Sequence, residues 1–90
     1  MPAVSNKTLR LILTSEQVRA ARMLLRWAQQ DLARESGVSL ATIKRLEAKP
    51  GPIEAHRPTI SAMEGAFDRG GVELIPENGG GMGVRLKRKS

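Results

Sequence analysis

The chain of 90 residues contains no cysteine, a single histidine and only two aromatic side chains. Without cysteine it can form neither disulfides nor Cys-ligated zinc sites, and His56 alone cannot build a metal cluster or a proton relay. Hydrophobic runs are also short, because residues 11–13 and 23–25 are the longest, whereas a membrane span needs about 20 residues. No segment resembles a signal peptide. We therefore expect a cytoplasmic protein that does not enter a membrane.

Catalytic groups are scarce as well. A chain of this length forms one small domain, which rarely builds a deep substrate cleft together with the shell that supports it. Glu73 and Glu77 are close in sequence, but no cluster of chemically useful side chains surrounds them. We expect neither an enzyme nor a bound cofactor.

The charge of the chain is strongly positive and unevenly distributed. Fifteen basic residues outnumber nine acidic ones, for a net charge of +6 and an isoelectric point near 10.8. A basic balance of this size on a small chain favours a polyanionic partner, most often nucleic acid. Four of the positive charges lie in the last six residues, and residues 87–90 form a basic tail.

Helix signals run from residue 14 to residue 71. Thr14 and Gln17 match a capping box, which begins a helix that we place at residues 15–26. Gly37 ends a second helix that opens at Gln29, and Ser39 caps a third helix over residues 40–47. Residues 49–57 are predicted to be a loop because of their prolines and glycine, and a fourth helix follows from Pro58 to the two glycines at 70–71.

The two ends of the chain have strand character. Residues 72–75 and 83–86 predict a β-hairpin over residues 72–86, and the seven-residue loop between them leaves the register open. Residues 1–13 form an N-terminal extension in which residues 8–13 suit either a strand or a fraying segment. A two-stranded ribbon is marginal in water, so we expect the hairpin to pair with residues 8–13 or with a second subunit.

The strongest pattern lies at residues 29–47, which read QQDLARESGVSLATIKRLE. Leu32 and Ala33 suit a core-facing position, Gly37 permits a left-handed turn, and Ile43 anchors the inner face of the next helix. The pattern resembles the helix-turn-helix of the Xre/Cro family of phage and bacterial repressors. This resemblance covers about residues 15–71 and implies a mainly α fold, a lambda-repressor-like bundle of four short helices that contains a helix-turn-helix, here followed by the C-terminal hairpin.

The resemblance also implies roles for individual residues. Arg22 matches an arginine that pairs, in many relatives, with the glutamate that ends the recognition helix, here Glu47. In the family the recognition helix enters the major groove of DNA while the preceding helix crosses the backbone. The residues expected to contact DNA are Gln29, Ser39, Leu40, Ala41, Thr42, Lys44, Arg45, Arg57 and Thr59.

The members of this set have different expected partners. Gln29, Ser39 and Lys44 suit phosphates, as do Arg57 and Thr59 at the start of the fourth helix, while Arg45 suits a bidentate contact to a guanine edge. The chain departs from many relatives at positions 40 and 41, which hold Leu and Ala. Apolar groups can contact a thymine methyl but cannot form bidentate hydrogen bonds to bases.

The function implied by the resemblance is a sequence-specific transcriptional regulator of double-stranded DNA, most simply a dimeric repressor that blocks a promoter by occupancy. Family members commonly bind inverted repeats with half-sites about 34 Å apart. The expected interface or sheet-core residues are Val72, Leu74, Val84 and Leu86. The basic residues from Arg85 to Lys89 would add phosphate contacts. An outward-facing Leu40 also allows an alternative, a protein-binding module of the same fold, such as an antitoxin or a factor that sequesters a regulator. The sequence does not identify the operator, the regulated genes or the choice between repression and activation.

Overall fold

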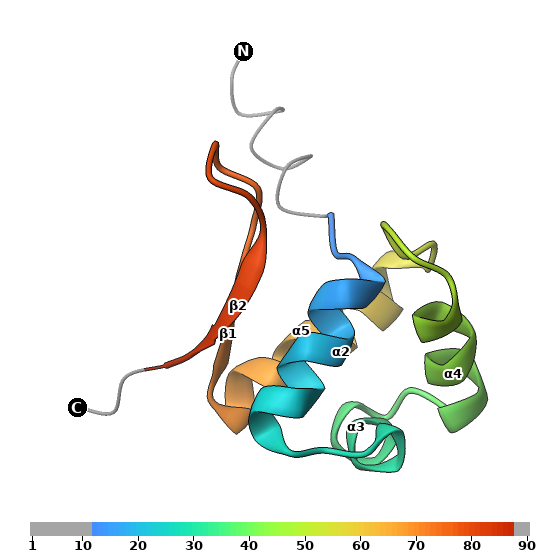
Figure 1. Ribbon diagram of the computed structural model, residues 1–90. Coiled ribbons are helices and arrows are strands. Elements are labelled where there is room, and N and C mark those ends of the chain that lie inside the picture. Colours follow the sequence, from blue (N-terminus) through green and yellow to red (C-terminus); the bar gives the residue numbers. More distant parts are fainter. Residues whose placement is uncertain (1–11, 88–90) are drawn as a thin grey trace.

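The structure, a computed structural model, describes residues 12–87. Within that range the chain forms four helices followed by a two-stranded antiparallel hairpin, which confirms the predicted mainly α architecture (Figure 1). In chain order the elements are α2 (Ser15–Leu25), α3 (Gln29–Ser36), α4 (Leu40–Ala48), α5 (Arg57–Gly70), β1 (Val72–Ile75) and β2 (Gly83–Leu86).

The ends of the helices follow the local chemistry that predicted them. The backbone N–H of Gln17 donates to Thr14 Oγ1 and the N–H of Thr14 donates to Gln17 Oε1, both at 3.1 Å, which completes the capping box. Gly37 (φ 79°) and Gly71 (φ 103°) end α3 and α5 in the left-handed conformation. Helix α2 ends at Leu25, one residue earlier than predicted, because Arg26 itself adopts a left-handed conformation (φ 59°).

One apolar core holds the helices and the first strand together. Its buried members are Leu13, Val18, Ala21, Leu32, Ile43, Leu46, Ile60, Met63, Ala66, Phe67 and Val72. The ring of Trp27 packs at the edge of this core and stacks on Phe67, with ring centroids 6.1 Å apart. Helix α2 lies between α4 and the hairpin, since it packs against α4 on one side and against both strands on the other (Figure 1).

The N-terminal strand prediction falls largely on residues outside the described range. Its described end pairs with the loop before α5 and not with the hairpin. Ser15 N–H donates to Gly51 O and Ile53 N–H donates to Leu13 O, both at 2.9 Å, around an antiparallel bridge between Thr14 and Pro52. Within the described residues the sheet therefore has two strands.

The hairpin register, which the sequence left open, pairs Val72 with Leu86 and Ile75 with Gly83. The side chain of Gln17 holds the open end of this ribbon. Its Nε2 group donates to the carbonyls of Ile75 and Gly83, each at 3.1 Å. One buried amide on α2 therefore fixes both strands to the helical bundle.

The glycine-rich tip of the hairpin is organised by its own side chains. Glu77 Oε2 accepts hydrogen bonds from the backbone N–H groups of Gly79 at 3.0 Å and Gly81 at 3.2 Å. Both glycines have positive φ, 102° and 93° respectively, which other residues adopt at a cost. The carboxylate therefore fills the turn that the glycines permit.

Two glycines of α5 are expected to respond oppositely to substitution by alanine. A Cβ at Gly70 would lie 2.9 Å from Leu25 Cδ1 and 3.1 Å from Trp27 Cζ2, and the ring cannot retreat because it stacks on Phe67. Gly70→Ala should lower the free energy of unfolding by about 1–3 kcal/mol. Gly65→Ala meets only the end of the flexible Arg69 side chain and should raise it by about 0.5–1 kcal/mol.

Urea denaturation of both variants tests this pair of predictions. Equal effects of the two substitutions would show that the packing of the α5 end against Trp27 is not tight.

The described residues include no helix with the length and apolar character needed to cross a membrane. Nor do they include a group of three or more His, Cys, Asp or Glu side chains placed to hold a metal ion.

Candidate nucleic-acid interface

Three helices meet at the carboxylate of Glu47, near the end of α4. Arg22 on α2 donates from Nε to Glu47 Oε2 and from Nη2 to Glu47 Oε1, each at 2.7 Å. Gln29, the first residue of α3, donates its Nε2 to the same Oε1 at 3.1 Å. The Glu47 side chain is only 4% exposed. A bidentate ion pair that is largely buried has little freedom to reorient, so it holds α4 in place against α2 and α3.

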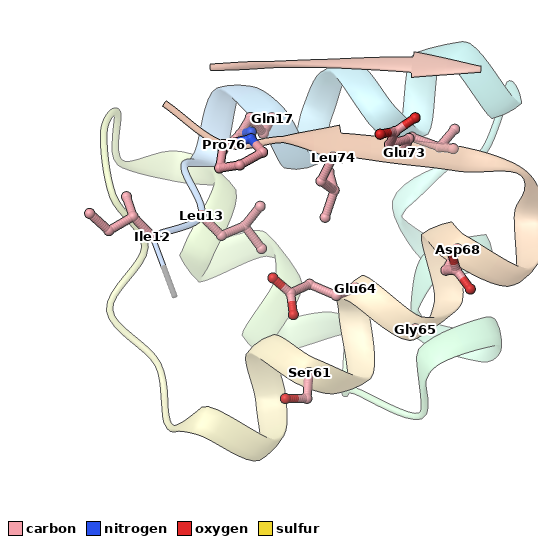
Figure 2. A pocket seen from close by; sticks show the side chains of 11 residues that line it. Ile12, Leu13, Gln17, Ser61, Glu64, Gly65, Asp68, Glu73, Leu74 and Pro76 are labelled. Carbon is pink, nitrogen blue, oxygen red and sulfur yellow. The ribbon is translucent and has the colours of Figure 1, made fainter. Parts of the chain in front are cut away.

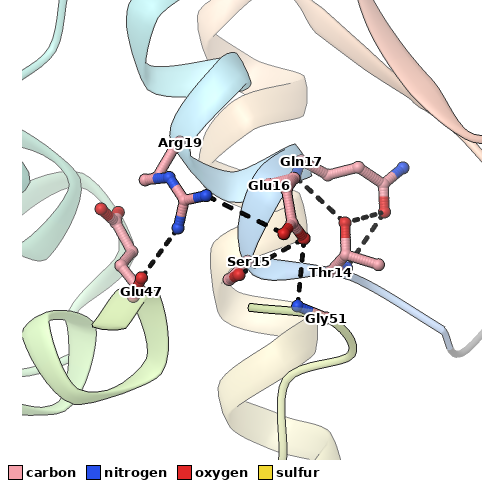
Figure 3. A network of polar contacts seen from close by, with 7 residues as sticks. All are labelled: Thr14, Ser15, Glu16, Gln17, Arg19, Glu47 and Gly51. Carbon is pink, nitrogen blue, oxygen red and sulfur yellow. Dashed lines mark hydrogen bonds and ion pairs between the residues drawn. The ribbon is translucent and has the colours of Figure 1, made fainter. Parts of the chain in front are cut away.

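A second arginine of α2 secures the backbone at the same point. Arg19 Nη1 donates to the carbonyl oxygen of Glu47 at 2.8 Å (Figure 3). The carbonyls of the last helical turn have no partner inside the helix, so a guanidinium satisfies one of them and also complements the helix dipole. Arg22 in turn donates its Nη1 to the carbonyl of Trp27 at 2.9 Å. The end of α4 and the turn between α2 and α3 are thus tied to one helix.

The opposite side of α4 faces solvent and is basic. Ala41, Lys44, Arg45 and Ala48 are all exposed and follow the i, i+3, i+4, i+7 spacing of one helix face. Ile43 and Leu46 are buried on the other side. Lys44 and Arg45 form no ion pair with another described residue, and the same holds for Lys49 just beyond the helix and for Arg57. We name this face, Ala41, Lys44, Arg45 and Ala48, the α4 face.

Leu40 departs from its expected place. It is partly buried and does not stand out on the surface, whereas Ala41 beside it is exposed. Leu40 is the first residue of α4, directly after the N-cap Ser39, and its side chain is partly covered by the protein. The argument for a protein-binding surface at Leu40 therefore loses its basis.

A shallow hollow of about 350 Å³ lies next to the first turn of α4. Ser39, Thr42 and Thr59 line it, three residues that the sequence assigned to DNA contacts, together with residues 36–38, Pro58 and Ala62. Ser39 Oγ accepts from the N–H of Thr42 at 3.2 Å and donates to Thr42 Oγ1 at 2.9 Å. The hollow therefore sits beside the N-terminal ends of α4 and α5, where backbone N–H groups favour an anion.

Gln29 uses its side-chain amide in a contact within the protein, which the phosphate assignment did not include. The amide is engaged by Glu47 at 3.1 Å, and Gln29 is partly buried. In this structure the side chain serves to position α3 against α4. The backbone N–H of Gln29, in the first turn of α3, is a further donor for a phosphate.

The residues assigned to a dimer interface separate into two groups. Val72 is 1% exposed and belongs to the core, so of its two expected places it takes the sheet core and not an interface. Leu74 and Val84 also pack against the core. Leu86 is 55% exposed and remains available to a partner.

The described cations of the hairpin side are neutralised within the chain. Arg85 pairs with Glu73 at 2.9 Å and Lys87 pairs with Asp68. The hydrogen bond and charge of Arg85 lower the pKa of Glu73 below its ordinary value of 4.5, and Glu73 raises the pKa of Arg85. These pairs lie apart from α4, so the expected phosphate contacts of residues 85 and 87 do not fit this arrangement. Residues 88–90 lie outside the described range.

Acidic groups near the helix starts are also engaged. Hydrogen bonds from Arg34 and from the N–H of Ala28 lower the pKa of Asp31 below its ordinary 3.8. A hydrogen bond from its own backbone N–H lowers the pKa of Glu16, as does the N–H of Gly51, which donates to its carboxylate at 3.2 Å (Figure 3). The carboxylates named here are thus ionised and engaged at neutral pH, while Lys44 and Arg45 on the α4 face pair with none of the carboxylates in residues 12–87.

The sequence did not predict the contacts of two residues, Arg19 and Gln17, that hold helices and strands in position. Arg19 lies one turn before Arg22 on the same face of α2, a spacing that could have suggested a shared target. Gln17 was assigned only to the capping box, although a glutamine, unlike a glutamate, has an amide that can donate two further hydrogen bonds.

A scan against models of protein families finds no match to this chain, and a search of curated proteins finds no significant relative.

Proposed function

We propose that the protein is a sequence-specific DNA-binding regulator in which α3 and α4 act as a helix-turn-helix and α4 enters the major groove. The observation that carries the proposal is the α4 face, where Lys44 and Arg45 are exposed between two alanines and form no ion pair with another residue of the described range. A B-DNA major groove is about 12 Å wide and admits a helix. Small side chains at Ala41 and Ala48 let the helix backbone approach the bases closely.

The proposed roles follow from position. Arg45 reads a guanine edge through two hydrogen bonds, and Lys44 neutralises a phosphate. The hollow beside Ser39, Thr42 and Thr59 receives a backbone phosphate, with Arg57 close by in sequence to supply charge. Ala41 contacts a thymine methyl. The hydrogen bonds of Glu47 with Arg22 and Gln29 hold α4 at a fixed angle to α2 and α3, so the side chains of the α4 face do not have to be reoriented on binding.

The proposed regulator acts as a dimer on an inverted repeat and represses by occupying a promoter. A dimer contacts two half-sites about 34 Å apart, one turn of the duplex, so its symmetry is mirrored in the operator.

Single substitutions in the α4 face test this proposal. Binding is measured on a duplex from the DNA that flanks the protein's own coding sequence and on a scrambled duplex, at two salt concentrations. Arg45→Ala should reduce the preference for the native duplex by about 5- to 150-fold, the equivalent of 1–3 kcal/mol. Lys44→Ala should weaken binding to both duplexes alike. It should also reduce the slope of log affinity against log salt concentration by about one.

The matched control is Lys87→Ala, which removes the same unit of charge from the hairpin side of the molecule. It should leave the preference unchanged. If all three substitutions weaken binding equally and no duplex is preferred, the interaction is one of net charge only and the proposed reading of sequence is wrong.

A further inference from the structure

The loop that follows α4 is held in place by the start of α2. Gly51 and Ile53 each form a backbone hydrogen bond of 2.9 Å with the segment 13–15. The N–H of Gly51 also donates to Glu16 Oε1 at 3.2 Å (Figure 3). Glu54 comes directly after Ile53 in the sequence, so the loop brings it to a set place beside α4.

Glu54 shares a small hollow with two cations. The hollow has a volume of about 140 Å³ and lies between the last turns of α4 and this loop. Arg45 and Lys49 line it from the side of the helix, and Glu54 lines it from the loop. All three residues are exposed, and none of them forms an ion pair within residues 12–87. The free protein therefore keeps a carboxylate next to the arginine of the α4 face without pairing the two.

Other carboxylates that follow α4 in the sequence lie on a different part of the molecule. Glu64, Asp68 and Glu73 line a groove of about 520 Å³ between α5 and β1 (Figure 2). Asp68 and Glu73 pair there with cations of the hairpin side. Glu54 instead lines a hollow together with a residue of the α4 face.

A carboxylate in this position disfavours binding to DNA in general. If α4 lies in the major groove, the phosphate backbones run along its sides, because the groove is about 12 Å wide and a helix with its side chains is about 10–12 Å in diameter. Residues 52–54 lie beside α4 and so face that backbone. The charge of Glu54 then repels phosphates and lowers the affinity for every duplex, whatever its sequence.

The same carboxylate can improve the choice between sequences. The guanidinium of Arg45 has five N–H donors in a planar fork, so one edge can bind a guanine while another donor binds a carboxylate. An arginine without such a partner can bind a backbone phosphate instead, a contact that carries no sequence information. A carboxylate beside Arg45 opposes this because it attracts the guanidinium and repels the phosphate.

We propose that Glu54 is a positioning residue that makes Arg45 selective for guanine. When α4 occupies the major groove, the Glu54 carboxylate accepts a hydrogen bond from the Arg45 guanidinium across the hollow and directs its remaining edge to the base. Glu54 itself contacts no base. Lys49 lacks the planar fork and neutralises a phosphate. This inference rests on the proposed function and deepens it, because it names a second residue on which the preference for guanine depends.

Glu54→Ala should separate affinity from selectivity. Binding to the scrambled duplex should become stronger by about 2- to 5-fold, because a negative charge leaves the interface. The preference for the native over the scrambled duplex should fall by about 3- to 10-fold, because Arg45 loses a hydrogen-bond acceptor. The matched control is Glu35→Ala, which removes an exposed carboxylate from α3 and should leave the preference unchanged.

The proposal is overturned if Glu54→Ala strengthens both duplexes equally, since the carboxylate then acts by its charge alone. An equal loss of preference in the Glu35→Ala control overturns it as well. In both cases an unmodified protein that still prefers the native duplex leaves the proposed function standing. An unmodified protein that prefers neither duplex overturns the proposed function itself, and this inference with it.

A double substitution tests whether Glu54 acts through Arg45. In a protein that already carries Arg45→Ala, adding Glu54→Ala should change the preference by less than about twofold, because the group that Glu54 positions is gone. A further loss of preference in this background would show that Glu54 contributes independently of Arg45 and would overturn its positioning role.

Discussion

Glu47→Ala should lower the free energy of unfolding by about 3–5 kcal/mol. The substitution leaves the largely buried Arg22 guanidinium, 13% exposed, without its carboxylate, although the bond to the Trp27 carbonyl remains. It also releases the amide of Gln29, so the contacts among α2, α3 and α4 loosen together. Chemical denaturation followed by circular dichroism measures the loss.

Two comparisons isolate the buried charge as the cause. Arg34→Ala breaks an ion pair of similar length, 2.8 Å to Asp31, but on the surface, and should cost less than about 1 kcal/mol. The double substitution Arg22→Met with Glu47→Leu removes both charges and should cost less than Glu47→Ala alone, because no ion is left buried. If Glu47→Ala lowers the free energy of unfolding no more than Arg34→Ala does, Glu47 does not hold the three helices in position.

Gln17→Glu should detach the hairpin from the bundle at neutral pH. The introduced carboxylate keeps the acceptor that caps Thr14 but loses both donors to Ile75 and Gly83, and it faces their two carbonyl oxygens. Leaving two partly buried acceptors without their donor costs about 2–6 kcal/mol, at about 1–3 kcal/mol for each such group. Hydrogen exchange should show lost protection in β1 and β2, while the amides of α3 and α4 stay protected.

The pH dependence of this variant distinguishes lost hydrogen bonds from lost packing. Beside two carbonyls the introduced carboxyl is harder to ionise, so its pKa is raised in the folded state. Its penalty is then smallest in acid, below the pKa of the unfolded chain, and grows as the pH rises through the folded pKa. Gln17→Ala has no titrating group, so its penalty should not change with pH. Parallel pH profiles for the two variants would show that the donors of Gln17 do not hold the hairpin.

The parts of the fold that depend on local chemistry could be predicted from the sequence. The capping box of Thr14 and Gln17 and the left-handed turns at Gly37 and Gly71 each need only a few neighbouring residues, and the structure contains all of them. The hairpin strands were also visible as the short segments 72–75 and 83–86 on either side of a glycine-rich loop. Their register was not, because a seven-residue loop does not fix the turn geometry.

The candidate site was less predictable because its supports are contacts between distant elements. The pairing of Arg22 with Glu47 came from a resemblance to a family and not from composition or spacing. Arg19 binds a backbone carbonyl, a group that every residue carries and that no sequence pattern distinguishes. The half-buried position of Leu40 and the engaged amide of Gln29 depend on how α3 and α4 meet, which only the packed structure specifies.

Selection from a random-sequence duplex library tests the central claim most directly. The unmodified protein is incubated with the library at physiological salt, bound duplexes are recovered and amplified over several rounds, and the enriched sequences are compared with those from a variant carrying Arg45→Ala. We expect one enriched motif, an inverted repeat with half-sites about one helical turn apart, in which a guanine in each half-site loses its preference in the variant. Enrichment of no sequence over the starting library would contradict the assignment of α4 as a reader of DNA sequence.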